Sequence, residues 1–102
     1  MLAQFTLIPI ATKTDSLSDA LTESIKLIIN SGLNYKAGPM GTTVEGEWNE
    51  IINLINRCRK QLLKNHSRVS IHITIDDRKN SKGRIEGKIT SLEKKIGKKL
   101  KQ

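Results

Sequence analysis

Hydrogen-bonding side chains gather beside one turn-rich segment of this chain. Thr42, Thr43 and Glu45 come directly after the tetrad Gly38-Pro39-Met40-Gly41. Near the start of the chain, Gln4 and Thr6 offer an amide and a further hydroxyl. Hydroxyl, amide and carboxylate groups can donate and accept hydrogen bonds to a small polar ring. In the alternative reading, the threonines are ordinary strand residues and Glu45 stabilises the start of a helix.

The remaining reactive side chains form no catalytic or metal-binding motif. His72 has no second histidine at ligand spacing, His66 lies at a loop edge, and one cysteine completes no zinc set. The pair Asp76-Asp77 adjoins Arg78, which favours an ion pair over acid and base catalysis. No nucleophile elbow, phosphate loop or dinucleotide fingerprint is present. We therefore predict a protein that is not an enzyme and has no metal site and no cofactor.

The first half of the chain predicts one strand, one helix and a hairpin. Residues 2–8 alternate between apolar and polar side chains, and Pro9 then ends the strand. Ser16 and Asp19 have capping-box spacing, and an apolar helical stripe follows as far as Ser31-Gly32. That stripe consists of Leu17, Leu21, Ile25, Ile28 and Ile29. Residues 33–37 and 42–46 predict two strands joined by the glycine-proline tetrad.

The second half predicts a helix and the clearest strand of the chain. Glu45, Glu47 and Glu50 cluster where a helix N-terminus attracts negative charge. Apolar residues then recur at helical spacing, with Trp48 as a predicted core anchor and Cys58 as a buried thiol. The stripe comprises Trp48, Ile51, Ile52, Ile55, Cys58, Leu62 and Leu63. Residues 68–76 predict a strand with Val69, Ile71, Ile73 and Ile75 on one face.

A polar loop over residues 77–83 leads to a basic helix predicted over residues 84–102. Its narrow apolar seam contains Ile85, Ile89, Leu92, Ile96 and Leu100. Gly87 and Gly97 weaken this helix by about 1 kcal/mol each. We therefore expect it to need a partner surface.

This order of elements predicts a ferredoxin-like α+β fold in a single domain over residues 1–102. Right-handed crossovers give a β-α-β-β-α-β four-stranded antiparallel sheet with two helices on one face and an extra C-terminal helix. The other face then carries a mixed polar set that we expect to meet another subunit or a ligand. That set is Gln4, Thr6, Ile8, Ser70, His72 and Thr74.

The net charge of +8 lies entirely in the last quarter of the chain. Residues 1–77 contain eight basic and eight acidic residues, and residues 78–102 contain ten basic and two acidic ones. An alternative function is therefore a nucleic-acid-binding ferredoxin-like domain that uses the basic C-terminal segment. RNA-binding sheets carry aromatic residues on their first and third strands, whereas residues 42–46 have none and Phe5 faces inward. We favour a solvated helix face for these lysines over a nucleic-acid partner.

The start of the chain lacks the pattern of a secretory signal. No basic start, long apolar run or cleavage site occurs in it, and no segment reaches membrane-spanning length. We expect a cytoplasmic protein with no membrane partner.

Two segments resemble a known family. Residues 38–48, GPMGTTVEGEW, and residues 68–78, RVSIHITIDDR, resemble the small thiamine-binding protein family. The resemblance extends to Ile8-Pro9, to residues 31–35 and to residues 88–92, and it rests on the order of these segments.

The resemblance implies function as well as fold. Family members are implied to pair through their sheets into homodimers or homotetramers and to bind thiamine or its hydroxymethylpyrimidine part. The implied site is the segment with Thr42, Thr43 and Glu45, with Gln4 and Thr6 on the neighbouring strand. Glu45 could balance the thiazolium charge. The resulting hypothesis is a non-catalytic small-molecule binding protein that self-associates.

Overall fold

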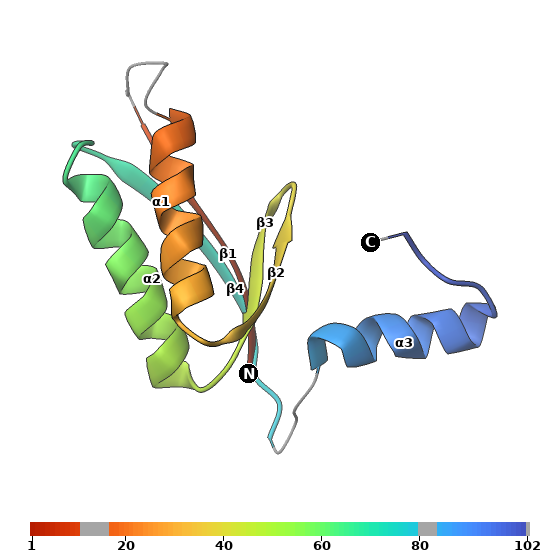
Figure 1. The fold of residues 1–102 in the computed structure, drawn as a ribbon. Helices are drawn as coiled ribbons and strands as arrows, with labels where there is room; N and C mark the ends of the chain where they lie inside the picture. The colour runs from red at the N-terminus through yellow and green to blue at the C-terminus, as the bar shows by residue number, and fades with distance from the viewer. Residues whose placement is uncertain (11–16, 80–83, 102) are drawn as a thin grey trace.

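The elements of the structure follow one another in the predicted order. It is a computed structural model that describes residues 1–10, 17–79 and 84–101. The elements are β1 (Leu2–Pro9), α1 (Leu17–Asn30), β2 (Asn34–Gly38), β3 (Gly41–Glu45), α2 (Trp48–Leu63), β4 (Val69–Asp76) and α3 (Arg84–Ile96). Figure 1 shows α1 and α2 side by side against one face of the sheet, with α3 on the other side. The predicted ferredoxin-like α+β fold is confirmed.

The sheet is antiparallel, and its central strand β1 has two neighbours of unequal length. The strand order is β2-β3-β1-β4. β1 pairs with β4 over its whole length, from Leu2↔Asp76 to Pro9↔Val69. Its pairing with β3 ends at Phe5↔Thr42. Within the described residues, β1 therefore has a neighbour on one side only from Thr6 to Pro9.

Pro9 belongs to the strand, one residue beyond the predicted end. The N–H of Ile10 donates to the carbonyl of Arg68 at 2.9 Å, so even-numbered residues of β1 bond to β4. Pro9 is odd-numbered, and its missing N–H falls on the unpaired side of β1. Proline is tolerated in a strand at such a position because no ladder hydrogen bond is lost.

Alternation along β1 separates a buried face from an outer face, as predicted. Ala3, Phe5 and Leu7 are buried with the core residues of the hairpin and the two helices. Those core residues are Ile28, Val44, Ile51, Leu54, Ile55, Cys58 and Leu62. On the outer face, the register places Gln4 between Thr43 and Thr74 and Thr6 beside His72, while the apolar Ile8 lies beside Ser70.

The helical stripes are only partly as predicted. Trp48 was predicted in the core, and this is wrong, because its side chain is 53% exposed. It is the first residue of α2, and burial along this helix begins one turn later at Ile51. In α1, Leu21 and Ile29 are exposed and Ser24 is buried between them. The predicted cap Ser16 and residues 80–83 of the predicted loop lie outside the described residues.

The ends of the helices have identifiable local causes. The Glu50 carboxylate accepts a hydrogen bond from the N–H of Glu47 at 3.0 Å, which forms a capping box at the start of α2. α1 ends before Gly32, which has a φ of 76°. α3 ends at Ile96 and so is shorter than the predicted 84–102. No helix in the described ranges is long and apolar enough to cross a membrane.

Cys58 predicts how stability changes at alkaline pH. Burial raises the pKa of its thiol to about 11. The thiol donates to the backbone carbonyl of Ser24 at 3.9 Å. Between about pH 9 and 11 the unfolded chain loses the thiol proton while the folded chain keeps it, so the free energy of unfolding falls. The expected loss is about 2–3 kcal/mol. Urea denaturation from pH 7 to 11 measures it, and Cys58→Ala, although less stable at pH 7, should show a shallower decline. Parallel declines would contradict this origin.

Candidate functional site

The structure divides the predicted site residues between two faces of the sheet. Thr42 and Thr43 are adjacent in β3, so their side chains point to opposite faces. Thr42 lies on the helix-covered face and is 8% exposed. Thr43 lies on the outer face, directly opposite Gln4 of β1. A molecule bound on one face of the sheet therefore cannot contact both threonine side chains.

Glu45 is at the end of β3, opposite Leu2 of β1, and is not among the residues that line the two cavities described below. Its carboxylate accepts a hydrogen bond from the side-chain amide of Asn34 at 3.3 Å, across the hairpin. Asn34 and Glu45 are register partners at the end of the β2–β3 ladder. Glu45 also does not take part in the cap of α2, which Glu47 and Glu50 form. The hydrogen bond between Asn34 and Glu45 therefore lies within the hairpin.

A cavity of about 490 Å³ lies where β1 loses its β3 neighbour. Its walls come from the unpaired half of β1, from one side of α1 and from the turn between β2 and β3. The lining residues are Phe5, Thr6, Leu7, Ile8, Pro9, Leu21, Ser24, Ile25, Ile28, Gly38, Pro39, Met40, Gly41 and Thr42. None of them is charged, and most are apolar. We refer to this space as the edge cavity.

Three hydroxyl groups line the edge cavity. Thr6 Oγ1 donates to the carbonyl of Met40 at 3.2 Å, which ties the hairpin turn to β1. Ser24 Oγ is buried and has no hydrogen-bond partner among the described residues. Leaving a buried hydroxyl unpaired costs about 1–3 kcal/mol. Thr42 supplies the third hydroxyl. Thr6 and Thr42 of the predicted set therefore both line this cavity, Thr6 from the outer face of the sheet and Thr42 from the helix-covered face. Ser24 was not among the site residues predicted from the sequence. The one indication of its role was its position as a serine among the apolar residues of α1.

The backbone of β1 also presents polar groups to the edge cavity. The N–H of Gly46 donates to the carbonyl of Met1 at 3.1 Å, so odd-numbered residues of β1 direct their backbone groups towards β3. The ladder with β3 ends at Phe5. The next odd-numbered residue is Leu7, whose N–H and C=O therefore face the cavity. A donor and an acceptor lie side by side at this edge.

A second cavity, of about 440 Å³, lies on the outer face between the sheet and α3. Gln4 and Thr43 of the predicted set line it. The other lining residues are Leu2, Ala3, Lys36, Thr74, Asp76, Ile85, Lys88, Ile89 and Lys101. Lys88 Nζ is 2.8 Å from Asp76 Oδ2, and this ion pair joins α3 to the end of β4. We refer to this space as the outer cavity.

The outer face lacks the aromatic residues that RNA-binding sheets use. Phe5 is 3% exposed and belongs to the core, as predicted. Tyr35 is the register partner of Val44 and so lies on the helix-covered side. In the described strands, no phenylalanine, tyrosine or tryptophan is on the outer face. The outer face of the described strands therefore offers no aromatic ring on which a base could stack.

Substitution of Gly41 tests how closely the hairpin turn packs against β1 at the edge cavity. Its φ is +151°, and a Cβ there would lie 2.9 Å from Thr6 Oγ1 and 3.2 Å from the Phe5 carbonyl oxygen. Gly41→Ala should therefore lower the free energy of unfolding by about 1–3 kcal/mol. Gly87→Ala is the matched control: nothing lies within 4 Å of its added Cβ, and it should stabilise α3 by up to about 1 kcal/mol. Urea denaturation compares them, and a Gly41→Ala protein as stable as the parent would contradict this packing.

Comparisons with known proteins agree on one family. A family model described as thiamine-binding protein matches residues 3–93. The UPF0045 protein YqgV of Bacillus subtilis is 32% identical over 100 residues, which cover 93% of this chain and 96% of the relative.

Solved structures share the fold. The hypothetical protein MJ1052 of Methanocaldococcus jannaschii has a TM-score of 0.79 at 26% identity, over 89% of this chain and 93% of that one. TM0486 of Thermotoga maritima, assigned provisionally to thiamine biosynthesis or salvage, has a TM-score of 0.77 at 26% identity, over 89% and 96%. With a match over residues 3–93, which spans nearly the whole sheet, α1, α2 and most of α3, this chain belongs to the thiamine-binding protein family.

Proposed function

We propose that this protein binds thiamine, or the hydroxymethylpyrimidine part of thiamine, in the edge cavity, and that it does so without catalysis. The observation that carries this proposal is the unpaired edge of β1 at Leu7, enclosed by apolar walls. The family to which the chain belongs, and the provisional assignment of the Thermotoga maritima relative, support thiamine as the ligand class.

An aminopyrimidine ring suits this edge chemically. Its amino group donates a hydrogen bond, and the adjacent ring nitrogen accepts one. The carbonyl and N–H of Leu7 offer the complementary acceptor and donor in the plane of the sheet. The apolar side chains of α1 and of the turn provide surfaces for the ring faces, and the volume lies within the usual range for small-molecule sites. Ser24 and Thr42 can contact the remaining polar atoms.

Binding without reaction accords with the lining of the edge cavity. Its described residues include no histidine, lysine, aspartate or glutamate to activate a hydroxyl group. Cys58 is fully buried, and its raised pKa keeps the thiol protonated at neutral pH. A free thiol of this kind also suits the reducing cytoplasm, where we place the protein.

Neighbouring threonines provide the test of this site. Thr42→Val keeps the shape of the side chain and removes a hydroxyl from the edge cavity, so hydroxymethylpyrimidine affinity should fall about tenfold to a hundredfold. Thr43→Val makes the same change on the outer face and should leave that affinity unchanged. Isothermal titration calorimetry of both variants measures the difference. A loss confined to Thr43→Val would place the ring on the outer face instead.

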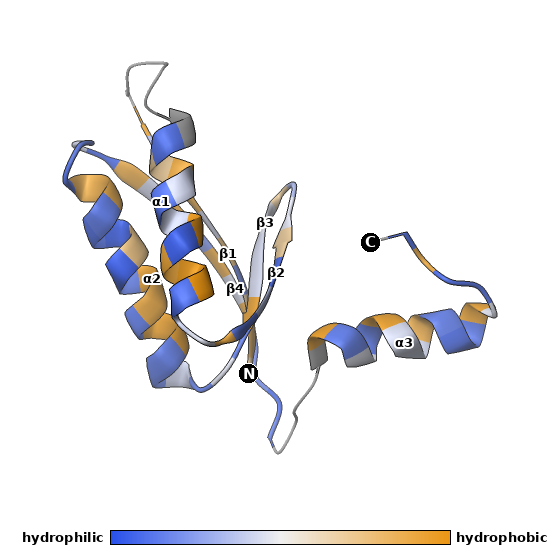
Figure 2. Cartoon of the chain, viewed as in Figure 1, coloured by the Kyte–Doolittle hydropathy of each residue, from blue (hydrophilic) through white to orange (hydrophobic). Residues whose placement is uncertain are grey.

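We also propose that the protein works as a homodimer or homotetramer in which α3 packs against a second copy. Leu92 and Ile96 are 48% and 60% exposed, on the same side of α3. Figure 2 shows apolar residues along this helix, which extends away from its own sheet. A helix of 13 residues is marginal in water without packing, and Gly87 weakens it further. A partner surface would stabilise it.

The apolar seam of α3 predicts the oligomeric state. The double variant Leu92→Gln and Ile96→Gln removes apolar contact area and should convert the oligomer to monomer at tens of micromolar. The control, Lys94→Gln with Lys95→Gln, changes two exposed neighbours and keeps the seam, so it should stay oligomeric. Light scattering reports both masses. A monomeric parent protein would overturn this part of the proposal.

A further inference from the structure

The outer cavity differs chemically from the edge cavity. Its polar lining consists of Gln4, Lys36, Thr43, Thr74, Asp76, Lys88 and Lys101. We propose that the outer cavity binds a phosphate-bearing small molecule. This site is separate from the proposed pyrimidine site and does not depend on it.

The charges and donors of the outer cavity match a phosphate group. Three lysines and one aspartate give its described lining a net charge of +2. Two threonine hydroxyls and one glutamine amide add further donors. The single carboxylate, that of Asp76, already accepts from Lys88 at 2.8 Å. A phosphate dianion carries the opposite charge and several acceptor oxygens, and charge-assisted hydrogen bonds to such oxygens are the stronger kind.

The lysines come from three separate parts of the chain. Lys36 is in β2, and its register partner on the outer face is Thr43. Lys88 is in α3, where the pair with Asp76 holds it beside the sheet. Lys101 follows α3 and reaches the cavity because the chain reverses direction after that helix. Sequence-distant cations thus converge on one cavity.

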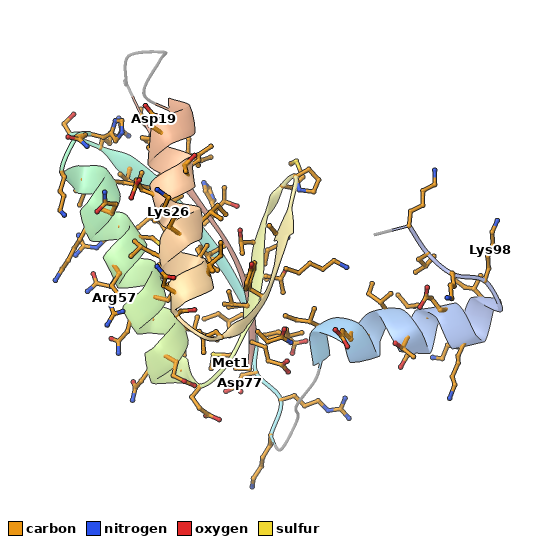
Figure 3. The ribbon with its side chains drawn as sticks, viewed as in Figure 1. Met1, Asp19, Lys26, Arg57, Asp77 and Lys98 are labelled. Carbon is orange, nitrogen blue, oxygen red and sulfur yellow. The ribbon has the colours of Figure 1, made fainter. Side chains whose placement is uncertain are left out.

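The reversal after α3 is fixed by Gly97 and Glu93. Gly97 has a φ of 76°, and its N–H donates to the carbonyl of Glu93 at 2.7 Å, which ends the helix. The Glu93 carboxylate then accepts from the N–H of Leu100, also at 2.7 Å. Figure 1 shows the C-terminal segment turning back over α3, and Figure 3 shows Lys98 at the outside of this bend. The returning segment brings Lys101 to the sheet side.

Apolar residues form the floor of the outer cavity. Leu2 is 7% exposed although it lies on the outer face, and Ile85 and Ile89 of α3 are partly buried beside the cavity. The charged residues lie around this floor and are exposed, with the side chains of Lys88 and Asp76 at 55% and 48%. A bound phosphate would therefore contact the lysines at a solvated rim, where charge pairs are weaker than in a buried site.

Titration with two simple probes tests the phosphate site. Inorganic phosphate and pyrophosphate are titrated into the full chain at low ionic strength and followed by calorimetry, with pyrophosphate expected to bind more tightly. Lys36→Gln, Lys101→Gln and Thr43→Val should each weaken pyrophosphate binding by about three- to tenfold. Lys60→Gln is the control, since it removes the same charge from α2 on the other side of the sheet. It should leave the affinity within about twofold, as a distant screened charge does.

Four results would overturn the phosphate proposal. The first is no binding of either probe, and the second is an equal loss of affinity in Lys60→Gln, which would indicate net charge alone. The third is equally tight binding of malonate, a dicarboxylate dianion. The fourth is tighter binding of a short RNA with the same lysine dependence. Lys101 lies beyond the last helix and is exposed, so Lys101→Gln should leave the fold intact and remain interpretable even if Thr43→Val misfolds. A protein that binds pyrophosphate but no hydroxymethylpyrimidine would refute the proposed function and retain this site.

Discussion

The unequal length of the two ladders on β1 is the constraint on which the rest of the structure depends. β4 pairs with β1 from Leu2 to Pro9, and β3 pairs with it only from Leu2 to Phe5. The β2–β3 hairpin turns at Gly38 and Gly41, so it cannot extend along the second half of β1. That half keeps its backbone groups unpaired on one side, and α1 encloses it. An exposed strand edge usually invites pairing with another chain. Here the hairpin turn and α1 convert it into a cavity.

Sequence periodicity predicted the fold because β1, β4 and the helices each carry a run of apolar residues at strand or helix spacing, whereas β2 is exposed throughout. The alternation in residues 2–8 gave the inner and outer faces of β1 correctly. Burial does not alternate along β4, where Ile73, predicted on the apolar face, is 41% exposed. The same period of two places Thr42 and Thr43 on opposite faces. Both threonines were assigned to one site because both belong to the segment that resembles the family. A resemblance between sequences does not tell to which face of the sheet each side chain points. The division of the site could therefore have been predicted from the alternation alone.

Other features depend on contacts between distant parts of the chain and could not be predicted. Trp48 is in phase with the stripe of α2, but periodicity does not tell where along a helix the sheet begins to cover it. Ser24 looks like a polar interruption of α1 until the hairpin turn and β1 close around it. Lys101 belongs to a run of lysines that a solvated helix explains equally well. Only the reversal at Gly97 distinguishes it from its neighbours.

The two cavities follow one another along β1, and Gly41 lies where they adjoin. A Cβ at Gly41 would lie close to both Thr6 Oγ1 and Gln4 Cγ, at 2.9 and 3.5 Å. Thr6 lines the edge cavity, and Gln4, two residues earlier on the same face, lines the outer cavity. Because Gly41 has no side chain, the space beside Thr6 and the space beside Gln4 both stay open. The described lining of the edge cavity is uncharged and that of the outer cavity has a net positive charge, so two cavities of different chemistry follow one another within about 7 Å along β1. The turn that ends the β3 ladder therefore helps to shape both cavities.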